Sequence, residues 1–406
     1  MPKNYIITGL DIGSGTIKVL VAQKKQGEAD LEVLSLSEET SLGVRKGVII
    51  DVPEVAGIIQ NCLEKAEQKI GQKIKSAYVN VGGCHLFSTC SRGLVSVSRA
   101  DKKISQGDIE RVFQAAQTFS LPSNREILDV FPKEFMVDGE REIKEPLGME
   151  GVRLEAEVLV LAGFTPYLRN LSQTILTANL QAEDLILTPL AGSRAVLDKR
   201  EKELGVAFLD IGAGTTDFCV FEEGNLLHAI ILPIGSANIT NDIAIGLKSD
   251  IDIAERIKLE FGACLFRGAD KKKKIEIDKA DSFVFSQRLL TKIIEARVSQ
   301  IFKEVNKELK KISRQGLLPA GIVLTGGGAR LPKIVELAKK ELKLPCRIGT
   351  PQGFYPEQDD PRLSTVCGLV LSGADLIGDD GGFPVISDFG RGIGPWFKKL
   401  LRTFIP

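Results

Sequence analysis

One six-residue pattern occurs twice in this chain, once in each half, and it limits the possible folds more than any other feature. Residues 9–23 read GLDIGSGTIKVLVAQ, and residues 208–222 read FLDIGAGTTDFCVFE. In both copies an apolar run leads into Asp-Ile-Gly-x-Gly-Thr, and alternating apolar residues follow. This is typical of a strand, a tight turn and a second strand. The repeat therefore predicts two related α/β halves, each with its own β-hairpin.

The residue types in the two turns suit phosphate binding. Glycine lacks a Cβ atom, so the backbone can turn tightly and its N–H groups can approach a phosphate. Hydroxyls add donors, and a lysine adds a point charge. Asp11 and Asp210, at the strand ends, are placed to hold Mg²⁺ through water, because this ion loses its hydration shell reluctantly. Two ordinary glycine turns capped by aspartate are the alternative. The residues expected at phosphate are Gly13, Ser14, Gly15, Thr16, Lys18, Gly212, Gly214, Thr215 and Thr216.

A third glycine cluster lies in the second half. Residues 321–334, GIVLTGGGARLPKI, predict a strand, three glycines and a helix with Pro332 in its first turn. The spacing is neither G-x-G-x-x-G nor a P-loop, so neither a Rossmann dinucleotide site nor a Walker ATPase is indicated. An ordinary βα turn is the alternative. We expect Gly326, Gly327, Gly328 and Arg330 to belong to the same ligand site as the hairpins.

Two D-x-G-x-G-T hairpins followed by a T-G-G-G loop resemble the actin/Hsp70/sugar-kinase superfamily. The resemblance implies an α/β, actin-like (ribonuclease H-like, duplicated) two-lobed ATPase fold with ATP and Mg²⁺ in the cleft between the lobes. It also implies that the helix around residues 253–258 contacts adenosine, with Glu255 and Lys258 near the ribose and base. Their i, i+3 spacing puts both on one helix face, where a surface ion pair is the alternative.

One position departs from the superfamily pattern. The segment that often carries a catalytic glutamate, E-P-x-A, here reads Leu187-Thr188-Pro189-Leu190-Ala191, so Thr188 stands at the glutamate position. A hydroxyl is a poor substitute for a carboxylate that orients the attacking water. We therefore expect ATP binding with weak or absent hydrolysis, and no catalytic residue is assigned.

Changes in pattern along the chain predict two insertions and a tail. Residues 84–164 are expected to form an inserted α+β subdomain, and residues 244–318 a helical and β insertion that binds a partner. The predicted units are 1–83 with 165–203 (first lobe), 84–164, 204–243 with 319–372 (second lobe), 244–318, a flexible linker over 373–394 and an amphipathic helix over 395–406.

The second insertion carries a basic stripe on a long helix predicted from about Ser286 to Ile312. A solvated helix face and a dock for an acidic peptide are both consistent with it. The stripe consists of Arg297, Lys303, Lys307, Lys310 and Lys311. A second basic run, Lys271 to Lys274, is expected to be a solvated loop.

The last twelve residues separate completely into an apolar and a basic half on a helical wheel. The tryptophan at its head suits a lipid interface. We expect a membrane-surface helix that binds an anionic leaflet weakly alone and firmly when several copies act together; docking on a protein is the alternative. The residues expected at the membrane are Trp396, Phe397, Lys398, Lys399, Leu400, Leu401, Arg402, Phe404 and Ile405.

An actin-like clamp with an inserted subdomain and this tail is similar to the FtsA family of bacterial cell-division proteins, which residues 77–85, AYVNVGGCH, also resemble. The resemblance implies a polymer on the cytoplasmic side of the inner membrane at the division site. It implies ATP and Mg²⁺ as cofactors and the FtsZ C-terminal peptide, further copies of the chain, anionic lipid and other division proteins as partners. A soluble pilus-assembly homologue or a sugar-kinase-like phosphotransferase is the alternative.

Composition excludes several other classes. Lysine plus arginine and aspartate plus glutamate both number 53, which argues against nucleic-acid binding. No apolar run is long enough to span a bilayer, and the first residues lack a signal-peptide core. With two histidines, a zinc site or a Ser-His-Asp triad is not expected; His85 is expected to be structural. The seven cysteines are expected to be reduced core thiols.

Overall fold

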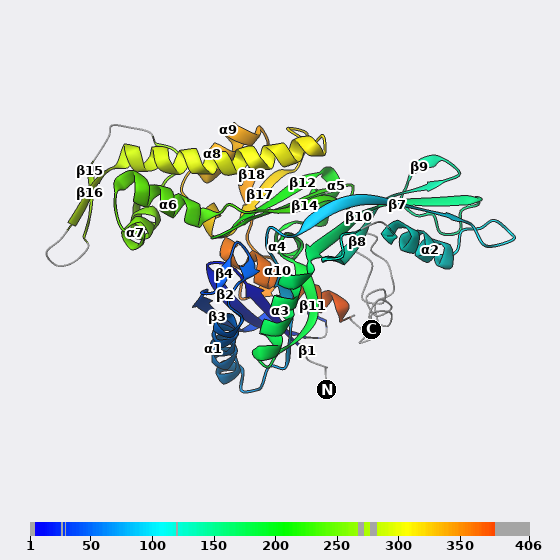
Figure 1. The fold of residues 1–406 in the computed structure, drawn as a ribbon, viewed down its shortest axis with the longest axis horizontal. Coiled ribbons are helices and arrows are strands. Elements are labelled where there is room, and N and C mark those ends of the chain that lie inside the picture. The colour runs from blue at the N-terminus through cyan, green and yellow to red at the C-terminus, as the bar shows by residue number, and fades with distance from the viewer. Residues whose placement is uncertain are drawn as a thin grey trace.

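The structure is a computed structural model that describes residues 5–25, 27–28, 30–118, 121–266, 272–276 and 282–377. The predicted amphipathic helix over 395–406 and most of the predicted linker lie outside these ranges. Figure 1 shows two stacked lobes, with one insertion at each end of the upper lobe.

Each lobe is built on one sheet, and the two sheets share a plan. The first has the order β11-β6-β1-β2-β3-β19, and the second has the order β14-β13-β12-β17-β18. In both, an antiparallel hairpin (β1 with β2, β12 with β13) is joined by a parallel neighbour, β6 or β17. The duplicated, two-lobed α/β architecture expected from the repeated motif is therefore confirmed.

The strands of the first sheet are β1 (Tyr5–Ile12), β2 (Thr16–Lys24), β3 (Leu31–Thr40), β6 (Ser76–Val81), β11 (Gln181–Leu187) and β19 (Phe354–Tyr355). Those of the second are β12 (Val206–Ile211), β13 (Thr216–Glu222), β14 (Asn225–Leu232), β17 (Gly321–Thr325) and β18 (Cys346–Ile348). The central strands are buried on both faces, which explains their nearly continuous apolar sequences. A small hairpin, β4 (Val44–Arg45) and β5 (Val48–Ile49), lies between β3 and the first helix.

Helices cover the first sheet. Helix α1 (Val52–Ile70) begins where the Asp51 side chain accepts a hydrogen bond from the Glu54 N–H, as the Asp-x-Pro pattern predicts. One apolar face of the helix, with Val55, Ile59 and Cys62, is buried and packs on β2 and β3. The other helices of this lobe are α3 (Thr165–Thr177), α4 (Thr188–Val196) and α10 (Ser364–Leu376), which follows the 3₁₀ turn η2 (Pro361–Leu363). Because α10 packs on β1, β2 and β6 and β19 pairs with β3, the prediction that 319–372 belong to the second lobe was wrong for these two elements. Helix α5 (Lys199–Leu204), which was predicted to end the first lobe, packs on β13 of the second sheet.

Helices α4 and α10 cross very closely. A Cβ atom on Gly368 would lie 1.7 Å from the Ala191 carbonyl oxygen, so only glycine permits this approach. Arg194 binds Asp375 with two hydrogen bonds of 2.8 and 2.9 Å on the same pair of helices. Since α10 continues to Leu376, the prediction of a flexible linker from residue 373 was wrong at its start. Gly373 packs directly on the Tyr78 ring.

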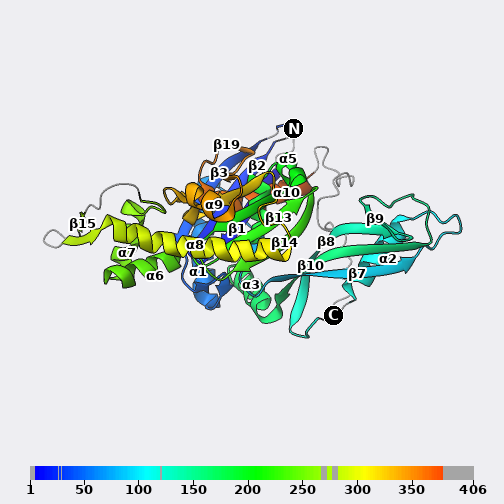
Figure 2. The same ribbon diagram turned by 90° about the horizontal axis from the view of Figure 1, so that it is seen from above.

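The inserted subdomain has its own sheet and core. Its strands β7 (Phe87–Ser96), β8 (Arg125–Val137), β9 (Glu140–Ile143) and β10 (Arg153–Phe164) have the order β7-β10-β8-β9, and α2 (Gln106–Gln117) covers one face. Phe113 and Phe135 meet edge to face in the core. Strand β9 was not predicted, because its sequence EREI is mostly exposed and lacks an apolar alternation. Figure 2 shows this subdomain projecting away from the two lobes.

The second insertion lies at the opposite end of the second lobe (Figures 1 and 2). It comprises α6 (Ser236–Leu247), α7 (Ile251–Phe261), β15 (Lys272–Glu276), β16 (Ser282–Ser286) and α8 (Gln287–Lys311). Helix α8 matches the predicted long helix. Helix α6 begins before the predicted boundary at residue 244, which falls inside it. The expectation of a loop at the lysine run was wrong for Lys272 to Lys274, which pair with β16 as strand β15; Lys271 is not described.

The prediction of core thiols is confirmed for four of the seven cysteines, and Cys346 is half-buried. All seven are free thiols, and Cys62, Cys219, Cys264 and Cys367 are buried. Cys84 and Cys90 are exposed at the start of the inserted subdomain, so the core assignment was wrong for these two. Among the described residues, no helix combines the length and apolar character needed to cross a bilayer.

Candidate functional site

The two repeated turns face each other across the gap between the lobes. Each closes with the same bond: Gly13 N–H donates to the Thr16 carbonyl at 3.1 Å, and Gly212 N–H donates to the Thr215 carbonyl at 2.9 Å. A Cβ on Gly15 would lie 2.7 Å from the Cβ atom of Ala213, so side chains would not fit between the turns. The glycines are therefore required where the lobes meet.

A cavity of about 220 Å³ lies at this meeting point. The predicted residues that line it are Asp11, Gly13, Ser14, Gly15, Thr16, Lys18, Thr188, Asp210, Gly212, Thr215, Gly326 and Gly327. Ten further lining residues were not among the predicted site residues: Ile12, Glu38, Gly47, Asn80, Gly82, Ala213, Asp217, Ser236, Arg362 and Thr365. Most of the repeated motif therefore converges on one site.

Four predicted residues lie near the cavity without lining it. Gly214 packs on Ser14, and the Thr216 hydroxyl donates to the Ile234 carbonyl at 2.7 Å, away from the cleft. Gly328 packs on Ile211. Arg330 is exposed at the end of the 3₁₀ turn η1 (Gly327–Arg330).

The expected helix after the glycines begins later than predicted. The glycines lead into η1, and α9 (Ile334–Leu342) starts two residues after Pro332. Lys333 lies between Pro332 and the first residue of α9, and its left-handed backbone (φ 69°) prevents the helix from starting earlier. Pro332 is therefore not in the first turn of α9, and that prediction was wrong.

Glu255 and Lys258 form a small cluster beside the cleft. Lys258 Nζ lies 2.7 Å from Glu255 Oε2 and donates to the Thr240 hydroxyl at 2.8 Å. Lys258 is buried, whereas Glu255 keeps 42% of its side chain exposed. Both lie on one face of α7, as the spacing predicts, but neither lines the cavity. Their contact with adenosine stays a prediction.

Three buried carboxyl groups converge at the floor of the cleft. Burial raises the pKa of Asp11, raises the pKa of Asp210 to about 6, and raises the pKa of Asp217 well above its ordinary value. Lys18 Nζ lies 3.4 Å from Asp11 Oδ2, and the Ser364 hydroxyl donates to Asp210 Oδ2 at 3.0 Å. The Oδ1 atom of Asp217 is buried without a hydrogen-bond partner. Such a group is costly unless something else pairs with it.

These residues fit a hydrated cation beside phosphates. In the part of the chain that the structure describes, no cluster of three or more histidine, cysteine or carboxylate side chains is placed to hold a metal directly. Asp11 and Asp210 line the cavity, and the unpaired Asp217 oxygen adds an acceptor. A cation that keeps its waters would be held by these carboxylates through hydrogen bonds, which suits Mg²⁺.

The Thr188 hydroxyl links α4 to the end of strand β6 in the wall of the cleft. It donates to the Val81 carbonyl at 3.1 Å and accepts from Asn80 Nδ2 at 3.3 Å. Asn80 Oδ1 in turn accepts from the Ile12 N–H at 2.7 Å. The hydroxyl therefore has its proton and one of its two acceptor sites already in use. It also lacks the negative charge and the basicity with which a carboxylate orients an attacking water.

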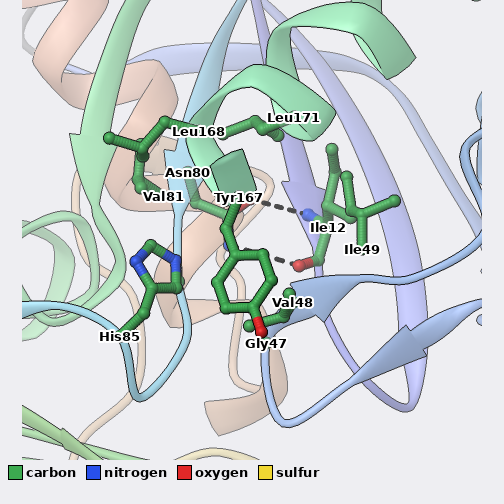
Figure 3. A pocket seen from close by; sticks show the side chains of 11 residues that line it. Ile12, Gly47, Val48, Ile49, Asn80, Val81, His85, Tyr167, Leu168 and Leu171 are labelled. Atoms are coloured by element: carbon green, nitrogen blue, oxygen red, sulfur yellow. Dashed lines mark hydrogen bonds between the residues drawn. The ribbon is translucent and has the colours of Figure 1, made fainter. Parts of the chain in front are cut away.

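A second, much smaller cavity of about 20 Å³ lies beside Asn80 and Val81, and Figure 3 shows the residues around it. It shares Asn80 and Ile12 with the main cleft. On its far side His85 Nδ1 accepts a hydrogen bond from the Phe164 N–H at 3.2 Å, and the His85 ring meets the Tyr167 ring edge to face at 5.2 Å. Burial lowers the pKa of His85 to about 4, so the imidazole is neutral. His85 joins the inserted subdomain to the first lobe, which is the structural role expected of it.

The basic stripe on α8 is exposed but partly paired. Arg297 is held by Asp242 of α6 in a two-bond ion pair with Nε and Nη2. Lys307 lies 2.7 Å from Glu304. Lys303 and Lys310 are exposed, and no ion pair within the described ranges includes either of them. The two lysines are therefore the basic groups of the stripe that are most available to a partner.

Two of the cavity residues that were not predicted could have been found from the sequence. Asp217 is the repeat equivalent of Lys18, so aligning the two copies would have found it. Asn80 is a polar residue in the apolar run of β6. Glu38 and Arg362 carried no signal of their own that marks them as site residues, and only the fold brings them to the cleft.

Comparisons with known proteins agree with this architecture. A family model described as "Cell division protein FtsA" matches residues 207–368, and one described as "SHS2 domain inserted in FTSA" matches residues 83–162. The chain is 35% identical over 374 residues to the cell division protein FtsA of Pseudomonas aeruginosa, covering 91% of this chain and 89% of that protein. It is 37% identical over 373 residues to the Bacillus subtilis protein of the same name, covering 91% and 84%.

Solved structures share the fold at much lower identity. The PilM-PilN type IV pilus biogenesis complex matches with a TM-score of 0.64 at 17% identity, covering 90% of this chain and 98% of that chain. MreB5 of Spiroplasma citri bound to ADP matches with a TM-score of 0.51 at 13% identity, covering 90% and 94%. At these identities the likeness concerns the fold alone.

Proposed function

The chain belongs to the FtsA family of cell-division proteins and has an actin-like fold; on this premise we propose that it is an ATP-binding protein that forms filaments on the cytoplasmic face of the inner membrane. There it anchors the tubulin-like FtsZ ring at the division site and recruits further division proteins. ATP with Mg²⁺ occupies the cleft between the lobes. Hydrolysis is slow or absent.

One observation supports this function above all: the two hairpins and the glycine loop surround one cavity with unbalanced buried carboxylates. Backbone N–H groups next to glycine are suited to bind phosphate oxygens, and Asp11 and Asp210 are suited to hold Mg²⁺ through water. Nucleotide with its cation would neutralise groups that are otherwise costly to bury. The MreB5 structure, which has the same fold, is bound to ADP.

Slow hydrolysis follows from Thr188. Its hydroxyl holds Val81 and Asn80 together and replaces a group that would orient water. A nucleotide that is bound but rarely hydrolysed stabilises the closed arrangement of the lobes, and this suits a persistent polymer.

Membrane attachment is proposed from the sequence of residues 395–406. Burying the six large apolar side chains roughly offsets the entropy of ordering the helix, and each basic residue adds about 1 kcal/mol at an anionic leaflet. A single copy would therefore bind reversibly, and a polymer would bind firmly through avidity.

Flotation with anionic liposomes, with and without Mg·ATP, tests the proposal. The full chain is compared with a truncation that ends at Ser387. We expect the full chain to float, more strongly with Mg·ATP, and the truncation to remain at the bottom. If both remain at the bottom, the tail binds protein, and a soluble pilus-type function is favoured instead.

A further inference from the structure

Two charged side chains in the cleft were not predicted as site residues: Glu38 on β3 and Arg362 in η2. Lys18, the other cation of the lining, is buried and lies 3.4 Å from Asp11. Arg362 keeps 39% of its side chain exposed. Within the lining, Arg362 is therefore the positive group that an entering ligand can reach.

Arg362 is held firmly on one side. Its Nε donates to Asp360 Oδ2 at 2.8 Å, and its backbone N–H donates to Asp360 Oδ1 at 3.0 Å. The bond from Nε holds one edge of the guanidinium group, and the backbone bond keeps the Asp360 carboxylate in place.

The other side of the guanidinium group is held loosely. Nη1 lies 3.6 Å from Glu38 Oε1, which is beyond hydrogen-bond distance. Glu38 is 29% exposed, and an ion pair that is open to solvent contributes little to stability. A stronger anion in the cleft can therefore displace Glu38 at small cost.

The backbone on both sides of Arg362 is tied to the clamp. The Pro361 carbonyl accepts the Gly326 N–H at 3.0 Å, and the Ser364 hydroxyl donates to Asp210 Oδ2 at 3.0 Å. Arg362 thus lies between the residue that holds the glycine loop and the residue that holds one of the buried aspartates. The position of Arg362 is therefore fixed relative to the glycine loop and Asp210.

The charges of the lining show what Arg362 would bind. Four acidic side chains (Asp11, Glu38, Asp210 and Asp217) and only two basic ones line the cleft, and each added phosphate brings further negative charge. A guanidinium group is planar and carries donors that match two oxygens of one phosphate. We propose that Arg362 exchanges Glu38 for the terminal phosphate of a nucleoside triphosphate and so distinguishes it from the diphosphate. This role rests on the proposed function of the cleft.

The test measures nucleotide affinity rather than turnover. Full-length wild type and Arg362→Ala are titrated with the non-hydrolysable triphosphate AMP-PNP and with ADP, both with Mg²⁺, by calorimetry. We expect the affinity of Arg362→Ala for the triphosphate to fall by about tenfold or more. Its affinity for the diphosphate should change by less than about threefold. Arg362→Lys, which keeps the charge without the planar donors, is expected to lose triphosphate affinity to a smaller extent. Glu38→Gln is expected to strengthen triphosphate binding.

Arg99→Ala is the matched control. Arg99 binds Asp101, two residues away, through Nε at 3.1 Å and Nη2 at 2.9 Å, but it lies exposed on the inserted subdomain. Its loss should leave both affinities unchanged.

Three outcomes would overturn the assignment. Equal losses for both nucleotides, or no loss for either, in Arg362→Ala would contradict it while leaving ATP binding intact. If thermal unfolding shows that Arg362→Ala is not folded, Arg362→Lys takes its place. An Arg362→Lys variant that binds the triphosphate as tightly as wild type would then contradict the role of Arg362. A wild type that binds neither nucleotide would refute the proposed function itself.

Discussion

Lys18 and Asp217 occupy equivalent positions in the two repeated hairpins. Each lies directly across the ladder from the aspartate of its own copy, Lys18 opposite Asp11 and Asp217 opposite Asp210. The first copy therefore pairs a carboxylate with a cation, and the second places two carboxyl groups together. The two hairpins match in backbone but not in charge, and this asymmetry leaves acidic groups in the cleft that the proposed Mg²⁺ would balance.

Asp217→Asn should stabilise the protein when nucleotide and Mg²⁺ are absent. The pKa of Asp217 is raised in the folded state, so folding favours its protonated form and stability falls as pH rises above the ordinary pKa near 4. Asparagine removes this penalty. We expect the melting temperature of the variant to exceed that of wild type by several degrees at pH 8, with the difference shrinking toward pH 4.

Differential scanning fluorimetry across this pH range checks the prediction. Asp359→Asn, at an exposed position, is the control and should behave as wild type. A constant difference at all pH values would mean that the charge of Asp217 is not the cause. With Mg·ATP present, wild type should gain more stability than Asp217→Asn.

Gly368→Ala should disrupt the crossing of α4 and α10. The added Cβ would lie 1.7 Å from the Ala191 carbonyl oxygen, a backbone atom that cannot move alone. We expect a loss of about 3 kcal/mol or more, by analogy with overpacked cores and their backbone shifts. Urea unfolding measures it.

Gly57→Ala supplies the matched control for this substitution. Gly57 also lies within a helix, α1, but a Cβ there meets no atom within 4 Å. Alanine should stabilise the helix by about 0.5–1 kcal/mol. If both substitutions had the same effect, close packing at Gly368 would not be the reason for the glycine.

The two histidines should both titrate below their usual range. Burial lowers the pKa of His85 to about 4, and burial also lowers the pKa of His228, which lies 3.1 Å from Glu308 and 3.4 Å from Ser88. Because the unfolded chain binds these protons near pH 6.5, folding stability should fall as pH drops from 6.5 toward 4. For the partly exposed His85 we expect about 1–2 kcal/mol after solvent screening.

NMR can follow both imidazoles directly, since the chain has only two. His85→Asn, which keeps an acceptor for the Phe164 N–H, should remove one signal and flatten the loss of stability in acid. An ordinary titration of either ring near pH 6.5 would contradict the buried, neutral state.

The repeated hairpins could be predicted because their function requires an unusual local sequence. Glycine is needed where a Cβ would collide, as at Gly15 and Gly326, so the pattern itself indicates the geometry. Helix α1 could be predicted from its cap and its apolar spacing. Glu38 and Arg362 could not, because they are common surface residue types, and only the crossing of separate chain segments brings them together.

Predictions failed where local patterns were overruled by packing. The glycine at 373 suggested a flexible linker, but it is required by the Tyr78 ring. Lys272 to Lys274 suggested a loop, yet they pair with β16, and Lys273 Nζ lies 5.8 Å from the centre of the Phe261 ring. The long stems of lysine can cover apolar surface while the charges stay in water.

If the FtsZ C-terminal peptide docks on the basic stripe of α8, Lys303→Glu with Lys310→Glu should weaken its binding strongly. Both lysines are exposed on one side of the helix, whereas Arg297 is already held by Asp242 and Lys307 by Glu304. Reversing two charges replaces attraction with repulsion and should lower affinity by about tenfold or more at low salt. Fluorescence anisotropy with the labelled peptide measures it, at two salt concentrations.

The control variant is Lys65→Glu with Lys69→Glu. It reverses the charge of two exposed lysines on α1, a helix of the other lobe. Because the total charge changes equally, any difference between the two double variants reports the place of binding rather than long-range attraction. Wild-type affinity in the α8 variant would exclude this face as the peptide site. Equal losses in both variants would mean that only net charge matters. A selective loss that grows smaller at high salt is expected if the exposed lysines of α8 bind the acidic peptide directly.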